Sequence, residues 1–211
     1  MQDGTHAAAV ESHWGGGVSP FAASWQKTMM WIFIVTDGLL FAGLLCGYGF
    51  LRMAGTIPWP DQAKVFSLPF IALMTFILIT SSATMGTAVG AAKLGDRRIT
   101  LTFLILTILG GAAFLGCQAY EWTHIIHDGA RLTGPAPGSR LLGVPVQFPA
   151  CFFVLTGFHG SHVFSGLVIL TITAIRTKLG KARAQGVELA GLYWHFVDLV
   201  WVFIFTLFYL L

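Results

Sequence analysis

Charged side chains are scarce in this sequence. Only 10% of its 211 residues are Asp, Glu, Lys or Arg, whereas 55% are hydrophobic. An ordinary soluble domain carries roughly 25% charged residues, so the composition places the chain among integral membrane proteins. Cysteine is scarce too. The odd count of three, at Cys46, Cys117 and Cys151 in or beside apolar runs, argues against a disulfide framework.

Five long stretches carry almost no charge. There is none in 65–92, 99–120 or 141–175, and a single acid in each of 28–51 and 189–211. A bilayer core about 30 Å thick needs about 20 apolar helical residues to cross it, and each stretch is long enough. Barrel strands would alternate apolar and polar residues, which these stretches do not. The sequence therefore predicts an all-α bundle of five transmembrane helices, near 27–52, 66–92, 99–124, 147–175 and 188–211.

Basic residues predict the orientation of these helices. Given five crossings, eight Lys and Arg fall on the side of the N-terminus and four on the other side. Because the cytoplasmic side carries the excess, we expect a cytoplasmic N-terminus and an external C-terminus. Residues 1–24 are then a flexible polar cytoplasmic tail, residues 25–211 are the transmembrane domain, and the proline-rich loop 131–149 is external. The basic residues lie at loop ends, so no nucleic-acid partner is expected.

Glycines recur at four-residue spacing within two of the predicted helices. The pairs are Gly43 with Gly47 and Gly86 with Gly90. Helices in lipid associate by close packing, which small residues permit. Further glycines lie in the third and fourth predicted helices, namely Gly110, Gly111, Gly116, Gly157, Gly160 and Gly166. We therefore predict tight helix contacts at the glycines of all four helices.

Ionisable residues inside a bilayer are expensive, so each is a candidate functional residue. The candidates are Asp37, Glu121, His159, His162, His195 and Asp198, with His124 beside Glu121. With a rise of about 1.5 Å per residue, we expect one polar layer in the cytoplasmic half. We place Glu121 and His124 in a smaller cluster near the external end.

Three interpretations of these polar residues stay open. They can hold the bundle together, handle protons or lipid head groups, or bind a metal or haem. Glu121-x-x-His124 has the spacing of di-iron bundles, but such sites need a second motif and two further glutamates. The sequence has neither, so no metal site is expected in this chain.

Two motifs are similar to a known family. FHGSHV at 158–163, followed by Gly166, resembles the F-H-G-x-H-V-x-x-G stretch of subunit III of the haem–copper oxidases. YWHFVDLVW at 193–201 resembles the closing helix of that family. Weaker similarities occur in FIVTD at 33–37 and QAYEW at 118–122. The resemblance thus extends from about Trp31 to the C-terminus.

The resemblance implies the five-helix bacterial form of this subunit, in the bacterial cytoplasmic (inner) membrane. Such a chain is not itself catalytic and holds no cofactor, because haem and copper belong to partner subunits. It packs on subunit I in a complex that includes subunit II, binds phospholipid, and supports proton uptake during dioxygen reduction. The candidate residues match polar family positions, with Asp37 as the buried acid. Quinol-oxidase forms can carry aspartate there, so the electron donor, cytochrome c or quinol, stays open.

Other functions remain as alternatives. One is the accessory subunit of nitric oxide reductase, and others are a stand-alone proton-coupled membrane protein or a small membrane cytochrome. A transporter would usually show internal repeats or broken helices, and the sequence shows neither.

Overall fold

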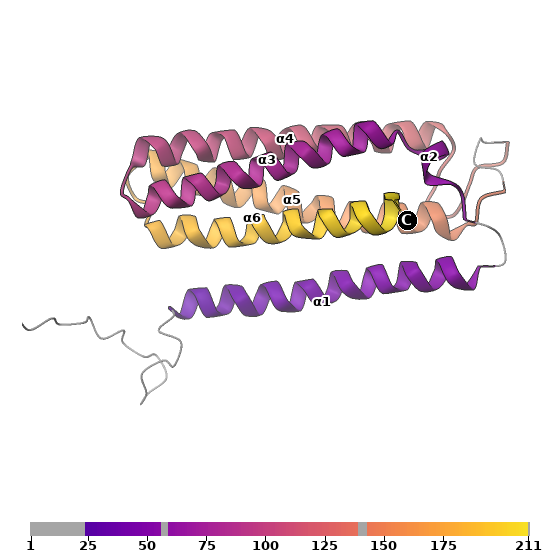
Figure 1. The fold of residues 1–211 in the computed structure, drawn as a ribbon, viewed down its shortest axis with the longest axis horizontal. Coiled ribbons are helices and arrows are strands. Elements are labelled where there is room, and N and C mark those ends of the chain that lie inside the picture. Colours follow the sequence, from indigo (N-terminus) through magenta and orange to yellow (C-terminus); the bar gives the residue numbers. More distant parts are fainter. Residues whose placement is uncertain (1–23, 56–58, 139–142, 211) are drawn as a thin grey trace, which may run out of the picture.

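Five long helices run up and down beside one another (Figure 1). The computed structural model describes residues 24–55, 59–138 and 143–210, so the predicted tail lies outside the described residues except for Ser24. The elements are α1 (Trp25–Ala54), α2 (Gln62–Val65), α3 (Leu68–Lys93), α4 (Arg97–His127), α5 (Gln147–Lys178), α6 (Ala184–Ile204) and a π-helical turn, η1 (Phe205–Leu210). Five helices are long and apolar enough to cross a membrane. The predicted fold class is confirmed, and each predicted helix end lies within four residues of the observed end when η1 is counted with α6.

Short capped turns set the antiparallel order of the helices. Asp96 caps α4, because its side chain accepts hydrogen bonds from the backbone N–H groups of Arg98 and Ile99 at 3.1 and 3.0 Å. Gly95 after α3 and Gly180 after α5 have φ angles of 78° and 72°. Residues with a Cβ rarely adopt this conformation. These glycines let the chain reverse direction within a few residues.

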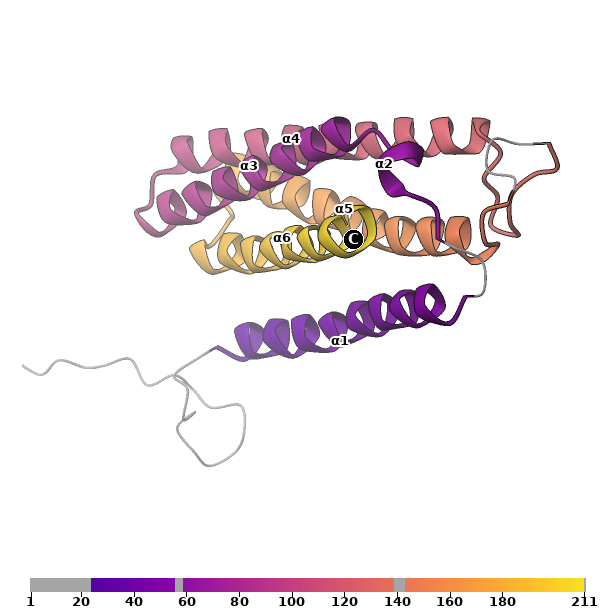
Figure 2. The same ribbon diagram turned by 45° about the vertical axis from the view of Figure 1, so that its right-hand side comes forward.

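The helix α1 forms a separate layer. It packs on α6 and α5 and stands apart from α3 and α4 in both views (Figures 1 and 2). Its buried Phe41 packs against Phe158 of α5 and Phe196 of α6, with ring centroids 5.0 and 6.5 Å away. Large apolar side chains elsewhere on α1, such as Leu39 and Phe50, are exposed. In a membrane this surface contacts lipid or another protein.

Two buried tryptophans of α6 join this helix to the rest of the bundle. Trp194 donates to the hydroxyl oxygen of Ser81 at 3.2 Å, and Trp201 donates to that of Thr75 at 2.9 Å. Both indole N–H groups are therefore satisfied by α3, as a water-free interior requires. Trp201 also meets Phe114 of α4 edge-on, with ring centroids 4.7 Å apart.

The predicted glycine contacts are wrong for both pairs. A Cβ added to Gly43, Gly47, Gly86 or Gly90 would meet nothing within 4 Å. The prediction is correct for several glycines of α4 and α5. A Cβ on Gly111 would lie 2.4 Å from Trp194, and one on Gly166 would lie 3.0 Å from the same ring. The spacing of glycines does not reveal which face of a helix meets a large neighbour.

Aromatic rings close the end of the bundle where α6 finishes. The turn η1 places Phe208 and Tyr209 in the interior. Phe208 stacks on Phe148 of α5 with ring centroids 5.8 Å apart, and Tyr209 meets Phe66 edge-to-face at 4.9 Å. The wider π-helical turn at the end of the helix thus carries both rings toward the core.

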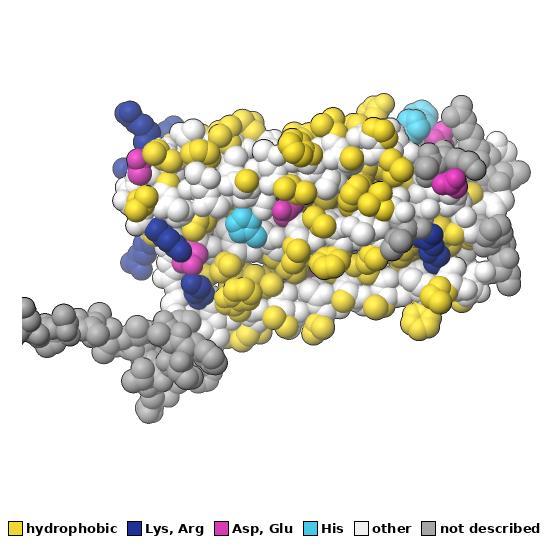
Figure 3. Space-filling model, in the orientation of Figure 1, with side chains coloured by type: hydrophobic (Ala, Val, Ile, Leu, Met, Phe, Trp, Pro, Cys, Tyr) yellow, Lys and Arg dark blue, Asp and Glu magenta, His cyan; other side chains and the backbone are white. Residues whose placement is uncertain are grey.

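Basic side chains gather at the other end, which we call the basic end (Figure 3). These side chains come from the starts of α1 and α4, the ends of α3 and α5, and the connection before α6. They are Lys27, Lys93, Arg97, Arg98, Arg176, Lys178, Lys181 and Arg183. Glu188 of α6 pairs with Lys27 at 2.8 Å and with Lys93 at 3.5 Å. These ion pairs join α1, α3 and α6 at the basic end.

Candidate functional site

The six predicted site residues lie in four separate places. Asp37 lies with His162, His195 lies with Asp198, and Glu121 and His159 are each elsewhere. The predicted polar layer described depth alone, and the structure separates its residues laterally. Depth follows from position along a helix, but the direction in which a side chain points follows from how each helix is rotated against its neighbours.

Asp37 of α1 faces His162 of α5. The two side chains approach to 3.4 Å between Asp37 Oδ2 and His162 Nε2, and the acid is only 9% exposed. The other ring nitrogen, Nδ1, lies 2.8 Å from the backbone carbonyl oxygen of Phe158. Because a carbonyl oxygen only accepts, Nδ1 carries a hydrogen.

This geometry places a carboxyl oxygen and a ring nitrogen face to face, although Oδ2 of Asp37 has no hydrogen-bond partner among the described residues. In a neutral ring with hydrogen on Nδ1, Nε2 presents a lone pair toward the carboxyl group of Asp37. Two acceptors face each other unless either Asp37 is protonated or His162 is charged. Phe41 and Phe158 pack against the imidazole, with ring centroids 5.2 and 4.7 Å away. The pair is therefore an acid and a base in close contact between two helices, shielded on these sides by apolar rings.

His159 lies in an aromatic cage one turn away. It is fully buried, and neither ring nitrogen has a hydrogen-bond partner among the described residues. The cage consists of Phe41, Phe114 and Trp201, whose ring centroids lie 6.4, 5.9 and 5.1 Å away. His159 and His162 share the Phe41 side of α5, as their spacing predicts. Only His162 reaches an acid.

Glu121 points into the core near the opposite end from the basic end. Its Oε2 accepts hydrogen bonds from Tyr209 at 3.0 Å and from the amide of Gln118 at 3.1 Å. His124 instead lies at the surface, 3.4 Å from Asp128. Glu121 and His124 both line a cavity of about 220 Å³, but their side chains have no hydrogen-bond partner in common among the described residues. The predicted cluster of these two residues is therefore divided between core and surface.

His195 connects α6 to α3 on the outer surface. Its Nδ1 lies 2.6 Å from the hydroxyl oxygen of Ser82, while the ring itself is exposed. Asp198 lies one turn further along α6, and its Oδ1 is buried without a hydrogen-bond partner among the described residues. In Figure 3 a cyan histidine and a magenta acid are visible on the surface between the two ends of the bundle.

Sequence reasoning missed Ser82, Gln118 and Tyr209, which complete these groups. The spacing rule for one helix face could have found Gln118, three residues before Glu121. Ser82 lies 113 residues from His195, and Tyr209 lies 88 residues from Glu121. No local pattern indicates those two pairings.

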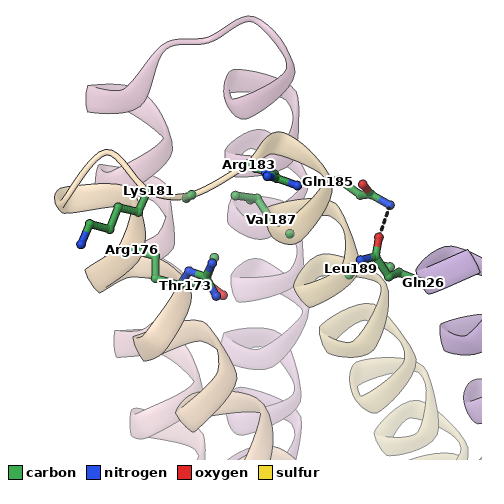
Figure 4. Close-up of a pocket in the computed structure, with 10 residues that line it drawn as sticks. Gln26, Thr173, Arg176, Lys181, Arg183, Gln185, Val187 and Leu189 are labelled. Carbon is green, nitrogen blue, oxygen red and sulfur yellow. Dashed lines mark hydrogen bonds between the residues drawn. The ribbon is translucent and has the colours of Figure 1, made fainter. Parts of the chain in front are cut away.

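A cavity of about 510 Å³ opens at the basic end (Figure 4). It is lined by the start of α1, the last turns of α5 and the first turns of α6, and Gln185 donates to Gln26 across it at 3.1 Å. Arg176, Lys181 and Arg183 surround it with positive charge. Such a cavity suits an anionic group. The density of basic residues in 176–183 is the sequence feature that could have indicated it.

The chemistry available to these groups is hydrogen bonding and proton sharing. Within the described parts of the chain, no three His, Cys, Asp or Glu side chains are placed to hold a metal ion. The fold and the polar groups together define a polytopic α-helical membrane protein with ionisable side chains between its helices.

Comparison with known proteins identifies the family. The family model described as cytochrome c oxidase subunit III matches residues 5–211. The chain therefore belongs to this family of terminal oxidase subunits, and the resemblance seen in its two motifs is confirmed.

The relatives include subunits of both quinol and cytochrome c oxidases. The chain is 37% identical to quinol oxidase subunit 3 of Bacillus subtilis over 186 residues, which cover 86% of this chain and 84% of the relative. It is 34% identical over 189 residues to the probable quinol oxidase subunit 3 of Staphylococcus saprophyticus, covering 88% and 89%. It is also 34% identical over 185 residues to the probable cytochrome c oxidase subunit 3 of Nocardia farcinica, covering 86% and 85%.

Proposed function

We propose that this chain is the non-catalytic subunit III of a respiratory haem–copper oxidase in the bacterial cytoplasmic membrane. In that role it packs on subunit I, binds phospholipid, and supports proton uptake and complex stability during dioxygen reduction. Haem and copper belong to partner subunits, including subunit II. The observation that supports the proton role is the 3.4 Å approach of Asp37 and His162, an acid and a base that face each other between two helices.

Co-purification tests the proposed complex. A tagged copy extracted in mild detergent should bring down the large catalytic subunit and haem absorbance, and the preparation should consume dioxygen. The single chain separated from its partners should show no haem spectrum. A complex that reduces nitric oxide but not dioxygen would instead identify the accessory subunit of a nitric oxide reductase. A haem spectrum that stays with the single chain would identify a membrane cytochrome.

The cavity at the basic end supports phospholipid binding. Its basic side chains and the start of α6 lie where the head group of a lipid would sit, and anionic lipids attract such clusters. The acyl chains would extend from this cavity along the surface of α1, α5 and α6 toward the Asp37 level. We therefore assign the phosphate to the side chains of Arg176, Lys181 and Arg183.

Neutralising the cavity should release the lipid. The triple variant Arg176→Gln, Lys181→Gln, Arg183→Gln should retain several-fold less anionic phospholipid than wild type, because each basic side chain near the surface contributes about 1 kcal/mol. Native mass spectrometry of the purified complex measures the bound lipid. Arg98→Gln, an exposed basic residue of the same end that does not line the cavity, is the matched control. Equal lipid in both variants would contradict the site.

We further propose that the basic end faces the cytoplasm, with residues 1–24 as a cytoplasmic tail before the transmembrane domain 25–211. In a cysteine-free background, a cysteine at Thr133 in the external loop should react with a membrane-impermeant thiol reagent in intact cells. A cysteine at Leu94, which is 88% exposed in the turn between α3 and α4, should react only after the membrane is opened. The reverse labelling pattern would invert the topology.

A further inference from the structure

Polar side chains occur in the middle of a surface that is otherwise apolar. We define the α3–α6 face by Ile79, Ser82 and Gly86 of α3 together with His195, Leu199 and Phe203 of α6. Its apolar members Ile79, Leu199 and Phe203 are 47%, 55% and 52% exposed. The hydrogen bond between Ser82 and His195 lies among them.

This hydrogen bond lies deep in the membrane. His195 follows Ala184, the start of α6, by eleven residues, and Ser82 precedes Lys93, the end of α3, by eleven residues. With a rise of about 1.5 Å per residue, both are about 16 Å from the basic end. That depth lies within a hydrocarbon core about 30 Å thick, in the half nearer the basic end. The imidazole is therefore exposed where lipid offers no hydrogen-bond partner.

The cluster also has hydrogen-bonding capacity left over. Nδ1 of His195 is occupied by Ser82, but Nε2 makes no hydrogen bond within the part of the chain that the structure describes. Oδ1 of Asp198 also lacks a partner there, but it is buried below the surface, so His195 presents the accessible group. Intramembrane polar groups of this kind face a protein interior or a watery cavity rather than lipid. A second protein helix could supply the missing partner.

The shape of the same face suits a helix. Ala83, Gly86 and Gly90 are exposed on successive turns of α3 beside Ser82. A Cβ added to Gly86 or Gly90 would meet nothing within 4 Å of this chain. Small residues let two helix backbones approach closely in lipid. The glycine spacing that makes no contact inside this chain is thus available to a partner.

We infer that the α3–α6 face docks a transmembrane helix of another subunit of the oxidase complex. That helix carries a hydrogen-bonding side chain at the level of His195, which pairs with Nε2 of the imidazole. The inference rests on the proposed role as an oxidase subunit and names the surface that the role uses.

A pair of glycine variants tests the surface without disturbing the fold. Gly86→Leu fills the proposed docking surface, whereas Gly116→Leu adds the same side chain to an exposed position of α4, where a Cβ also meets nothing within 4 Å. With a tag on the catalytic subunit, Gly86→Leu should lower the amount of this chain retained after detergent washing at least several-fold. Gly116→Leu should leave it unchanged. Equal retention of the two variants, high or low, would overturn the assignment.

A variant at His195 tests the proposed hydrogen bond to the partner helix. His195→Leu should reduce retention roughly three- to tenfold, the range expected for one hydrogen bond between membrane helices. The matched control is Thr171→Val on α5, which removes an exposed hydroxyl bonded only to the carbonyl of Leu167 in its own helix. Retention equal to that of the control would contradict a hydrogen bond to a partner at His195.

Photo-crosslinking separates failure of this inference from failure of the proposed function. A photoreactive residue at Leu199 should crosslink to another oxidase subunit, and one at Ile172, 52% exposed on α5, should label lipid. If Leu199 labels only lipid while the oxidase subunits still co-purify, the docking face is wrong and the proposed function stands. If no oxidase subunit co-purifies with the wild-type chain, the proposed function itself fails.

Discussion

Gly111→Leu should abolish accumulation of this subunit in the membrane. A Cβ at Gly111 would lie 2.4 Å from the Trp194 ring and 2.8 Å from Leu167, and the rest of a leucine side chain would extend further into both. Trp194 cannot move aside, because it is 1% exposed and its indole N–H is bonded to Ser81. Helix α4 would have to separate from α5 and α6. We expect a destabilisation of more than about 3 kcal/mol, which is at or beyond the upper end of the usual cost of overpacking a core.

The amount of subunit in isolated membranes and its thermal unfolding in detergent measure this effect. Gly116→Leu is the matched control, five residues along the same helix, with nothing within 4 Å of an added Cβ. If Gly111→Leu accumulated and unfolded like this control, the packing of α4 against Trp194 described above would be incorrect.

Asp37→Asn should leave the oxidase assembled but slow its turnover progressively as the pH rises. The asparagine amide keeps the size of the side chain and can donate a hydrogen bond to Nε2 of His162. It cannot bind and release a proton as a carboxyl group can. If the pair helps to supply protons to the catalytic subunit, its loss matters most when protons are scarce. We expect turnover near that of wild type below neutral pH and several-fold lower turnover above it.

The pH–activity profile of the assembled enzyme therefore decides the role of Asp37. A profile of Asp37→Asn that overlays wild type at every pH would limit Asp37 to holding α1 against α5. Asp37→Leu should also reduce assembly, because it leaves His162 buried without a partner, which costs about 1–3 kcal/mol. Thr36→Val is the control for this second effect, since the Thr36 hydroxyl bonds only to carbonyl groups of its own helix.

The number, type and position of the membrane helices could be read from the sequence. In lipid each backbone N–H and C=O must be satisfied inside its own segment, so a run of about 20 apolar residues is sufficient to specify a helix. The same locality explains why the predicted helix ends were accurate, with Ser24 and Asp96 capping α1 and α4. The two motifs at 158–163 and 193–201 were sufficient to indicate the family that the comparison then established.

Only the tertiary structure decided which polar residues meet. The helical rise set the depths of Asp37, His162 and His195, but it did not show that Asp37 meets His162 whereas His195 meets Ser82. Ser82 reached His195, and the π-helical turn brought Tyr209 to Glu121. Helices in lipid gain no hydrophobic energy by choosing one face over another, so their rotation depends on close packing and on a few hydrogen bonds between distant residues. Those terms arise between segments, and no pattern within one segment contains them.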